Sequence, residues 1–233
     1  MSSQHPISRD YRSVQQLATE RIRAAIIEGI FKPGEKLNQS ELAKRFEISR
    51  IPIREALRTL EGEGLIQFHP NYGAIVSAVT EGEIRDIYET RAALEVVTAL
   101  RSIANVRPAV IARMKAALNE MKKTSDPERW VRLNDEFHLV LYQVGGRPRL
   151  LSMIAMTRNL VAACIRTSVM SSENRQIFDT QHAAILRAVE KRDSADLRKQ
   201  LREHLARSCD LIIESLKRSG VLVEREKNSG SRK

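Results

Sequence analysis

Apolar residues recur with a helical period through most of this chain, beginning close to its N-terminal end. Between residues 14 and 26 they share one face, which predicts a helix that ends before the turn signal at 32–35. Ser40 is the predicted N-cap of a short second helix, which reaches about Phe46. Ser49 is the predicted N-cap of a third helix, which runs to about Glu61.

The helical period then breaks. Two short β-prone runs, 65–68 and 74–76, lie on either side of a loop rich in turn residues, which predicts a β-hairpin. Three short helices followed by a hairpin indicate a winged helix-turn-helix domain at 13–79. The polar residues before it, 1–12, are expected to be disordered.

From Thr80 onward the pattern is helical. Thr80 and Glu83 have the spacing of a capping box, which starts the first helix of this part. Neither a strand pattern nor a Gly-rich phosphate loop follows residue 80. The sequence therefore predicts a mainly α protein whose second domain, 80–219, is all helical and is followed by a polar tail at 220–233. The expected helices span about 80–105, 108–123, 125–144, 148–169, 173–191 and 194–219.

Charge adds a class of partner to this picture. The formal net charge is +10, which favours a polyanionic partner such as nucleic acid. Because the basic residues are spread along the whole chain, the net charge does not locate a DNA-binding surface. The positions of particular arginines have to identify that surface.

The cysteines and the apolar runs indicate the cellular compartment in which the protein is expected. Cys164 and Cys209 lack metal-site spacing and are expected to be buried free thiols, with a disulfide or redox switch as the alternative. The N-terminal residues lack the apolar core of a signal peptide, and no apolar run approaches the roughly 20 residues of a membrane span. We expect a cytoplasmic protein with no membrane partner.

Arginines recur every four residues in the third predicted helix. Arg50, Arg54 and Arg58 share one face, whereas Ile53 and Leu57 lie on the opposite, core face. Recognition helices present their N-terminal residues to base edges, and arginine bonds guanine bidentately, so Arg50 and Arg54 are the predicted base readers. Arg58, one turn later, is the predicted phosphate contact. The alternative is a solvated arginine stripe paired with nearby glutamates.

This region resembles the GntR family of bacterial regulators over about residues 14–79. The resemblance implies binding to double-stranded operator DNA through a helix-turn-helix of about Gln39 to Arg58, with a wing that approaches the minor groove. Gly73 in that wing also has a structural explanation, as a glycine that the hairpin turn needs. The predicted DNA-binding residues are Ser49, Arg50, Arg54, Arg58, Asn71 and Gly73. The matching motifs are Pro33-Gly34-Glu35-x-Leu37, Leu42-Ala43, Ser49-Arg50-x-Pro52-Ile53-Arg54-Glu55-Ala56-Leu57, Leu60-Glu61-x-Glu63-Gly64-Leu65 and Gly73-Ala74-x-Val76.

Three of the five histidines lie on apolar helical stripes of the second domain: His138, His182 and His204. One such histidine is usually a hydrogen-bonded core residue, and that remains the alternative here. Three neutral imidazoles on helices that pack together suit a transition metal. Asn134 precedes His138 by one helical turn, so its amide oxygen can point the same way.

The second domain resembles the FCD ligand-binding domain of the FadR-type branch of the same family, over about residues 80–216. The resemblance implies an antiparallel helical bundle, usually dimeric, with a divalent metal held by one Asp and three His beside a carboxylate-binding pocket. Carried over by position, the metal ligands are Asn134, His138, His182 and His204, with Asn where the family pattern has Asp. Zinc, nickel and manganese are the candidate metals. The matching features are Arg91-x-x-Leu94-Glu95, Asn134-x-x-Phe137-His138, His182-x-x-Ile185-Leu186-x-Ala188-Val189, Asp193 and His204.

Arg91 is the predicted effector-binding residue, because a guanidinium can clamp the carboxylate of a small acid. The alternative is a helix-surface ion pair with Glu95 or Glu89. The leading hypothesis is a homodimeric, non-enzymatic transcription regulator whose operator binding responds to a small carboxylate effector with the help of a metal. Two rivals stay open: a metal-dependent enzyme acting on a small organic acid, and a constitutive DNA-binding protein with structural histidines.

Overall fold

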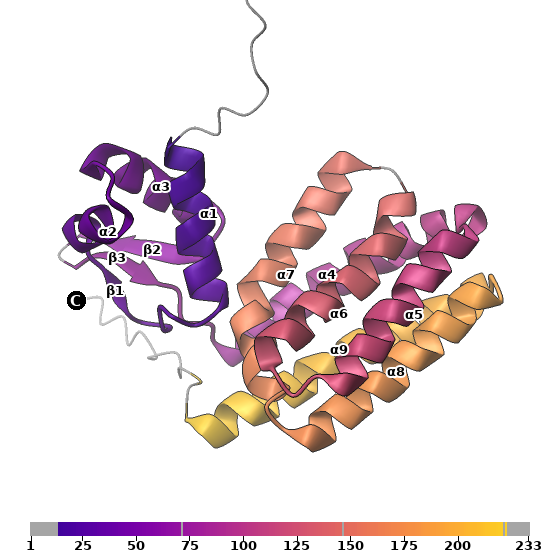
Figure 1. Ribbon diagram of the computed structural model, residues 1–233. Helices are drawn as coiled ribbons and strands as arrows, with labels where there is room; N and C mark the ends of the chain where they lie inside the picture. The colour runs from indigo at the N-terminus through magenta and orange to yellow at the C-terminus, as the bar shows by residue number, and fades with distance from the viewer. Residues whose placement is uncertain (1–13, 71, 146, 221, 223–233) are drawn as a thin grey trace, which may run out of the picture. The chain divides into compact units, whose positions relative to one another are not determined.

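The computed structural model describes residues 14–70, 72–145, 147–220 and 222 (Figure 1). The chain divides into two compact units, with the boundary between Ser77 and Ala78. The segment 1–12, expected to be disordered, and nearly all of the tail 220–233 lie outside the described residues. The predicted fold class, mainly α with one small β-hairpin unit, is confirmed.

The N-terminal unit is a winged helix-turn-helix. Its helices and strands are α1 (Val14–Ile27), β1 (Lys36–Leu37), α2 (Gln39–Phe46), α3 (Arg50–Gly62), β2 (Ile66–His69) and β3 (Gly73–Val76). The predicted hairpin is the antiparallel pair of β2 and β3, and β1 adds a third strand on the free edge of β3. The sequence did not reveal β1, because two residues are too few for an alternating pattern.

One predicted N-cap is wrong. Helix α2 starts after Asn38, whose Oδ1 accepts the backbone N–H groups of Ser40 at 2.9 Å and Glu41 at 3.4 Å, so Ser40 lies inside the helix. Asparagine is at least as good an N-cap as serine, and here it comes two residues earlier. Ser49 does occupy the N-cap position of α3, but its side chain makes no capping hydrogen bond.

The second unit is helical throughout its described length. It comprises α4 (Glu81–Ser102), a 3₁₀ turn η1 (Ile103–Asn105), α5 (Pro108–Lys123), α6 (Pro127–Val144), α7 (Pro148–Ser168), α8 (Ser172–Glu190) and α9 (Ser194–Ser219). The capping box of Thr80 and Glu83 is confirmed, with both reciprocal hydrogen bonds formed. Asp193 is the N-cap of α9, and its carboxylate accepts the N–H groups of Ala195 and Asp196.

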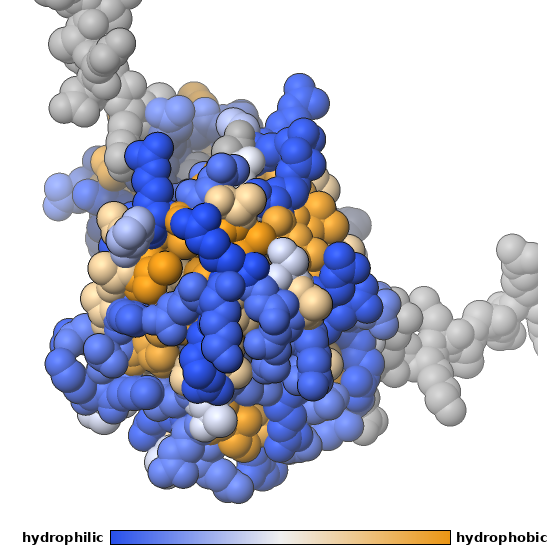
Figure 2. All heavy atoms as spheres, turned by 90° about the vertical axis from the view of Figure 1, so that its right-hand side faces the viewer, coloured by the Kyte–Doolittle hydropathy of each residue, from blue (hydrophilic) through white to orange (hydrophobic). Residues whose placement is uncertain are grey.

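Helix α4 packs against α6, α7 and α9, and α8 packs against α5 and α9, so the bundle encloses a core between α4, α6, α8 and α9 (Figure 1). Hydrophilic side chains predominate on the face of the molecule seen in Figure 2, with apolar side chains in patches between them. Both cysteines are free and buried, as expected.

Helix α7 departs from the expectation that no segment approaches a membrane span. Within the described residues it is long and apolar enough to cross a membrane, judged by length and composition only. Core helices of soluble proteins satisfy the same criterion. Arg158, near its middle, is 3% exposed and forms ion pairs inside the bundle with Glu95 and Asp135.

Candidate functional sites

The exposed face of α3 carries the three arginines that the sequence singled out. Arg50, Arg54 and Arg58 are exposed, whereas Ile53 and Leu57 on the opposite face are fully buried. The helix is fixed to the unit by that apolar face, which packs against α1 and α2. The arginine face is thus held rigidly and left open to solvent.

The three arginines differ in how firmly they are held. Arg58 Nη1 lies 2.9 Å from a carboxylate oxygen of Glu61, and its guanidinium stacks 4.3 Å from the ring centroid of Phe68. Arg54 makes one long ion pair with Glu55, at 3.7 Å. Among the residues that the structure describes, Arg50 has no ion-pair partner. The alternative interpretation of this face was a solvated stripe of arginines paired with nearby glutamates. It therefore applies to Arg58 far more than to Arg50.

The wing contains two of the predicted DNA-binding residues. Gly73 starts β3 with a φ of 78°, a left-handed conformation that favours glycine, and a Cβ added there would meet nothing within 4 Å. The backbone turn therefore accounts for this glycine, and the surrounding space is open. Asn71 lies outside the described residues.

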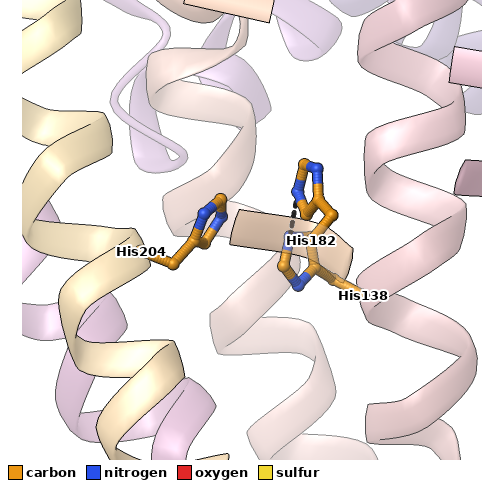
Figure 3. Close-up of side chains that lie close together, drawn as sticks. All are labelled: His138, His182 and His204. Carbon is orange, nitrogen blue, oxygen red and sulfur yellow. Dashed lines mark hydrogen bonds between the residues drawn. The ribbon is translucent and has the colours of Figure 1, made fainter. Parts of the chain in front are cut away.

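Three buried histidines converge in the second unit. His138 of α6, His182 of α8 and His204 of α9 point toward one another (Figure 3). Each offers a ring nitrogen, and these atoms all lie within 4.8 Å of one another. The Nε2 atoms of His138 and His182 are 3.2 Å apart. The predicted convergence of the three rings is therefore what the structure shows.

The outer ring nitrogens of two of these histidines have hydrogen-bond partners. His204 Nδ1 lies 3.1 Å from Gln181 Oε1, an amide oxygen that can only accept, so this nitrogen carries the hydrogen. Tyr142 donates its hydroxyl hydrogen to Glu95 at 2.7 Å and is 3.4 Å from His138 Nδ1, from which it can accept. Both rings then turn an Nε2 lone pair toward the centre of the cluster, as metal ligands do.

Burial keeps all three rings neutral. It lowers the pKa of His204 to about 3, with Arg91 adding to the effect. It also lowers the pKa of His138 and His182 well below the usual value, and Arg158 acts in the same direction. A metal ligand must present a lone pair, so neutral imidazoles are the form that a metal needs.

The donor set fits a divalent transition metal. For metal–nitrogen bonds of about 2.1 Å, neighbouring ligand nitrogens lie about 3.0–3.4 Å apart, and the two facing Nε2 atoms are 3.2 Å apart. Without an ion, one of those two nitrogens has to donate to the other. His182 Nδ1 has no hydrogen-bond partner in the described chain, so its ring is held by packing against Trp130 and Phe137.

A small cavity, with room for about one water molecule, adjoins His204. Asn134 lines it, is 5% exposed, and within the described chain its amide has no hydrogen-bond partner. The cavity is also lined by Tyr88, Arg91, Trp130, Phe178 and His204. The fourth predicted metal ligand and the predicted effector-binding arginine therefore face one space.

Arg91 is buried, at 2% exposure, and its Nε donates to Glu95 at 2.7 Å. The predicted alternative, an ion pair with Glu95, is thus present, but it lies inside the bundle rather than on the helix surface. Among the described residues, Arg91 Nη1 has no hydrogen-bond partner. The ion pair fixes the guanidinium and leaves one of its donors available.

Glu95 belongs to a charge network that the sequence did not reveal. Arg158 Nη1 lies 3.2 Å from Glu95, and Arg158 Nη2 lies 2.6 Å from Asp135. Burial alone would raise the pKa of Glu95, but Arg91 and Arg158 outweigh it and hold that pKa at about 2. Only the four-residue spacing of Arg91 and Glu95 could have indicated part of this network, because the other partners come from distant helices.

The comparisons with known proteins agree with this division of the chain. A family model described as "Bacterial regulatory proteins, gntR family" matches residues 15–76, and one described as "FCD domain" matches residues 86–207. Each matched segment lies within one of the two compact units.

Relatives of similar length carry the same kind of name. The uncharacterized HTH-type transcriptional regulator YdhC of Bacillus subtilis is 27% identical over 195 residues, which cover 82% of this chain and 87% of YdhC. The HTH-type transcriptional repressor RspR of Escherichia coli is 27% identical over 198 residues, which cover 82% of this chain and 86% of RspR. The solved structure of E. coli McbR/YncC matches 87% of this chain and 98% of its own, with a TM-score of 0.77 and 20% identity, and thus supports the fold.

Proposed function

Because the chain belongs to the GntR family of bacterial regulatory proteins, with an FCD domain after its winged helix-turn-helix, and is a transcription regulator, we propose that a small carboxylate effector modulates its binding to operator DNA. A divalent metal assists that response. The observation that carries the proposal is the convergence of three neutral histidines beside a cavity lined by Arg91, whose Nη1 has no hydrogen-bond partner among the described residues.

On DNA, the exposed face of α3 reads the operator. Arg50 and Arg54 contact base edges in the major groove from the first turns of the helix. Arg58, held by Glu61 and Phe68, contacts a phosphate and contributes to position rather than sequence. Ser49 lies at the start of the same helix, and the wing from Asn71 to Gly73 approaches the minor groove.

The second unit holds the metal through His138, His182, His204 and the amide oxygen of Asn134. When bound, zinc, nickel or manganese supplies a Lewis-acidic position for an oxygen of the effector. Arg91 pairs with the effector carboxylate through Nη1, while Glu95 keeps the guanidinium in place. The protein acts in the cytoplasm, as a homodimer on a two-fold symmetric operator.

Purification of the full chain without chelator tests this function. Elemental analysis should find close to one equivalent of a divalent transition metal, and mass spectrometry of the released small molecules should find an acid. That acid should change the affinity for an operator selected from random DNA. His204→Ala should abolish the response and leave acid-free operator binding nearly unchanged, since His204 is far in sequence from the DNA-reading helix. A full response in verified metal-free protein would remove the metal from the mechanism.

A further inference from the structure

Helix α3, all of whose residues the structure describes, exposes one large apolar side chain, that of Ile51. It is 66% exposed. The apolar side chains on the core face of the helix are fully buried: Ile53, Ala56, Leu57 and Leu60. Ile51 therefore contributes little to the core of the N-terminal unit. Helix propensity does not explain it either, because isoleucine is β-branched and is a weaker helix former than alanine, leucine or arginine.

Ile51 lies among the arginines of the exposed face. At about 100° per residue, it is about 20° from Arg58, about 60° from Arg54 and about 160° from Ile53 around the helix axis. It is the second residue of α3, directly after Arg50. Recognition helices present their first residues to base edges, so a helix that reads DNA through Arg50 and Arg54 brings Ile51 to the bases as well.

An isoleucine side chain in the major groove can favour one base over the others. The base edges there carry hydrogen-bond donors and acceptors, and the apolar group that they present is the 5-methyl group of thymine. Isoleucine cannot replace the hydrogen bonds that water makes with the polar atoms of the other bases, so its approach to those bases costs free energy. Opposite thymine, it removes two apolar surfaces from water, which is favourable.

We propose that Ile51 is a specificity-determining residue, which contacts the methyl group of one thymine in each operator half-site, beside the base pair that Arg50 contacts. This inference rests on the function proposed above, in which α3 lies in the major groove. Arg50 and Arg54 supply hydrogen bonds and charge, whereas Ile51 selects its base by apolar contact. An operator selected from random DNA should therefore contain this thymine in both half-sites.

Replacement of thymine by deoxyuridine tests the contact, because it removes the methyl group and leaves base pairing unchanged. Each thymine of the selected half-site is replaced in turn, in both half-sites, and the full-length protein is titrated by fluorescence anisotropy. Burial of one methyl group corresponds to about a four-fold change in affinity, so at the position that Ile51 contacts the two replacements together should weaken binding at least about ten-fold. Deoxyuridine at thymines outside the half-sites is the matched DNA control and should leave the affinity unchanged.

Ile51→Ala removes the apolar contact and should not disturb folding, since the side chain is exposed and alanine favours the helix. It should bind the thymine operator about ten-fold more weakly than wild type, and its affinities for the thymine and deoxyuridine operators should differ by less than about two-fold. Ile51→Val keeps a branched apolar side chain and should retain most of the wild-type difference. Ile30→Ala is the control: Ile30 is 50% exposed in the same unit but outside α3, and both affinities should stay at their wild-type values.

Three results would overturn the inference: selected half-sites without a preferred thymine, wild-type affinity that no deoxyuridine replacement changes, or an Ile51→Ala protein that keeps the full difference between thymine and deoxyuridine. The proposed function fails in a different way. The thymine contact would then be present, while neither an acid nor a metal changes operator affinity. Conversely, operator binding that responds to an acid but not to deoxyuridine would reject the role of Ile51 and retain the regulatory function.

Discussion

Asn134 stands where the resemblance to the FCD domain implies an aspartate among the metal ligands. All three histidines are neutral, and the asparagine amide is neutral too, so a divalent ion bound here keeps its full charge of +2. An aspartate would leave +1. The site should therefore bind metal more weakly than an Asp-containing site, and each bound metal should attract a carboxylate more strongly.

Asn134→Asp should raise metal affinity and reduce the coupling between metal and effector. Coupling of binding free energies is reciprocal, so the acid should tighten metal binding by the same factor as the metal tightens acid binding. Calorimetric titration of metal with and without the acid, on wild type and variant, measures both factors. Wild-type metal affinity that is independent of the acid would contradict the prediction.

Glu95 contributes to the stability of the folded protein rather than to the binding of metal or effector. Its carboxylate is fully buried between Arg91 and Arg158, and its pKa of about 2 lies below the value of about 4.3 expected in the unfolded chain. Because the folded-state pKa is the lower one, the stabilisation is complete above about pH 4.3 and is lost as the pH falls toward 2.

Glu95→Gln should destabilise the fold by about 3–5 kcal/mol at pH 7, since it leaves two buried guanidinium groups short of one negative charge. The difference in the free energy of unfolding between wild type and Glu95→Gln should shrink on acidification below pH 4.3. Urea unfolding across pH 3–7 measures this difference. Glu81→Gln is the control: Glu81 pairs with Arg85 and Lys217 at the partly exposed start of the same helix, so its removal should change stability little. Equal effects of both substitutions would refute the assigned role.

At the scale of elements, helices were predictable because period, prolines and caps are local properties. Helices α5 and α9 have the predicted bounds, Pro108–Lys123 and Ser194–Ser219. The two-residue strand β1 could not be predicted, since its existence depends on pairing with β3 across the sequence. The network of Glu95 and Arg158 was hidden for the same reason: its members lie 63 residues apart. The histidines were found because each one interrupts an apolar stripe within its own helix.

Helix α3 combines a fixed apolar face with an arginine face whose members are unequally held. Arg50→Ala and Arg54→Ala should each lower specific operator affinity by about 1–3 kcal/mol and relax base preference at one position per half-site. Arg58→Ala should instead weaken binding to all sequences alike, because Arg58 is held by Glu61 and Phe68. Fluorescence anisotropy on a selected operator and its single-base variants distinguishes these effects. Unchanged base preference in both of the first two variants would mean that α3 is not the reading helix.

One recognition helix alone is not enough for specific binding to an operator. A single helix reads too few base pairs to find one site in a genome, so regulators of this architecture need two copies on a pseudo-palindromic operator. The helical unit has surface suited to a second copy. Only 39% of the most apolar stretch of α7 is buried inside the protein. On the same helix, the side chains of Met153 and Met156 are 48% and 40% exposed.

The full chain should therefore sediment as a dimer at micromolar concentration. Met153→Glu combined with Met156→Glu should weaken that dimer at least about ten-fold, because burying two carboxylates in an apolar interface is unfavourable. Binding to the intact operator should fall with it, while binding to an isolated half-site should not. Met170→Glu is the control: Met170 is 71% exposed just beyond the end of α7, and the dimer should persist. A wild-type monomer at tens of micromolar would refute the dimer, and a dimer that survives the double substitution would move its interface away from α7.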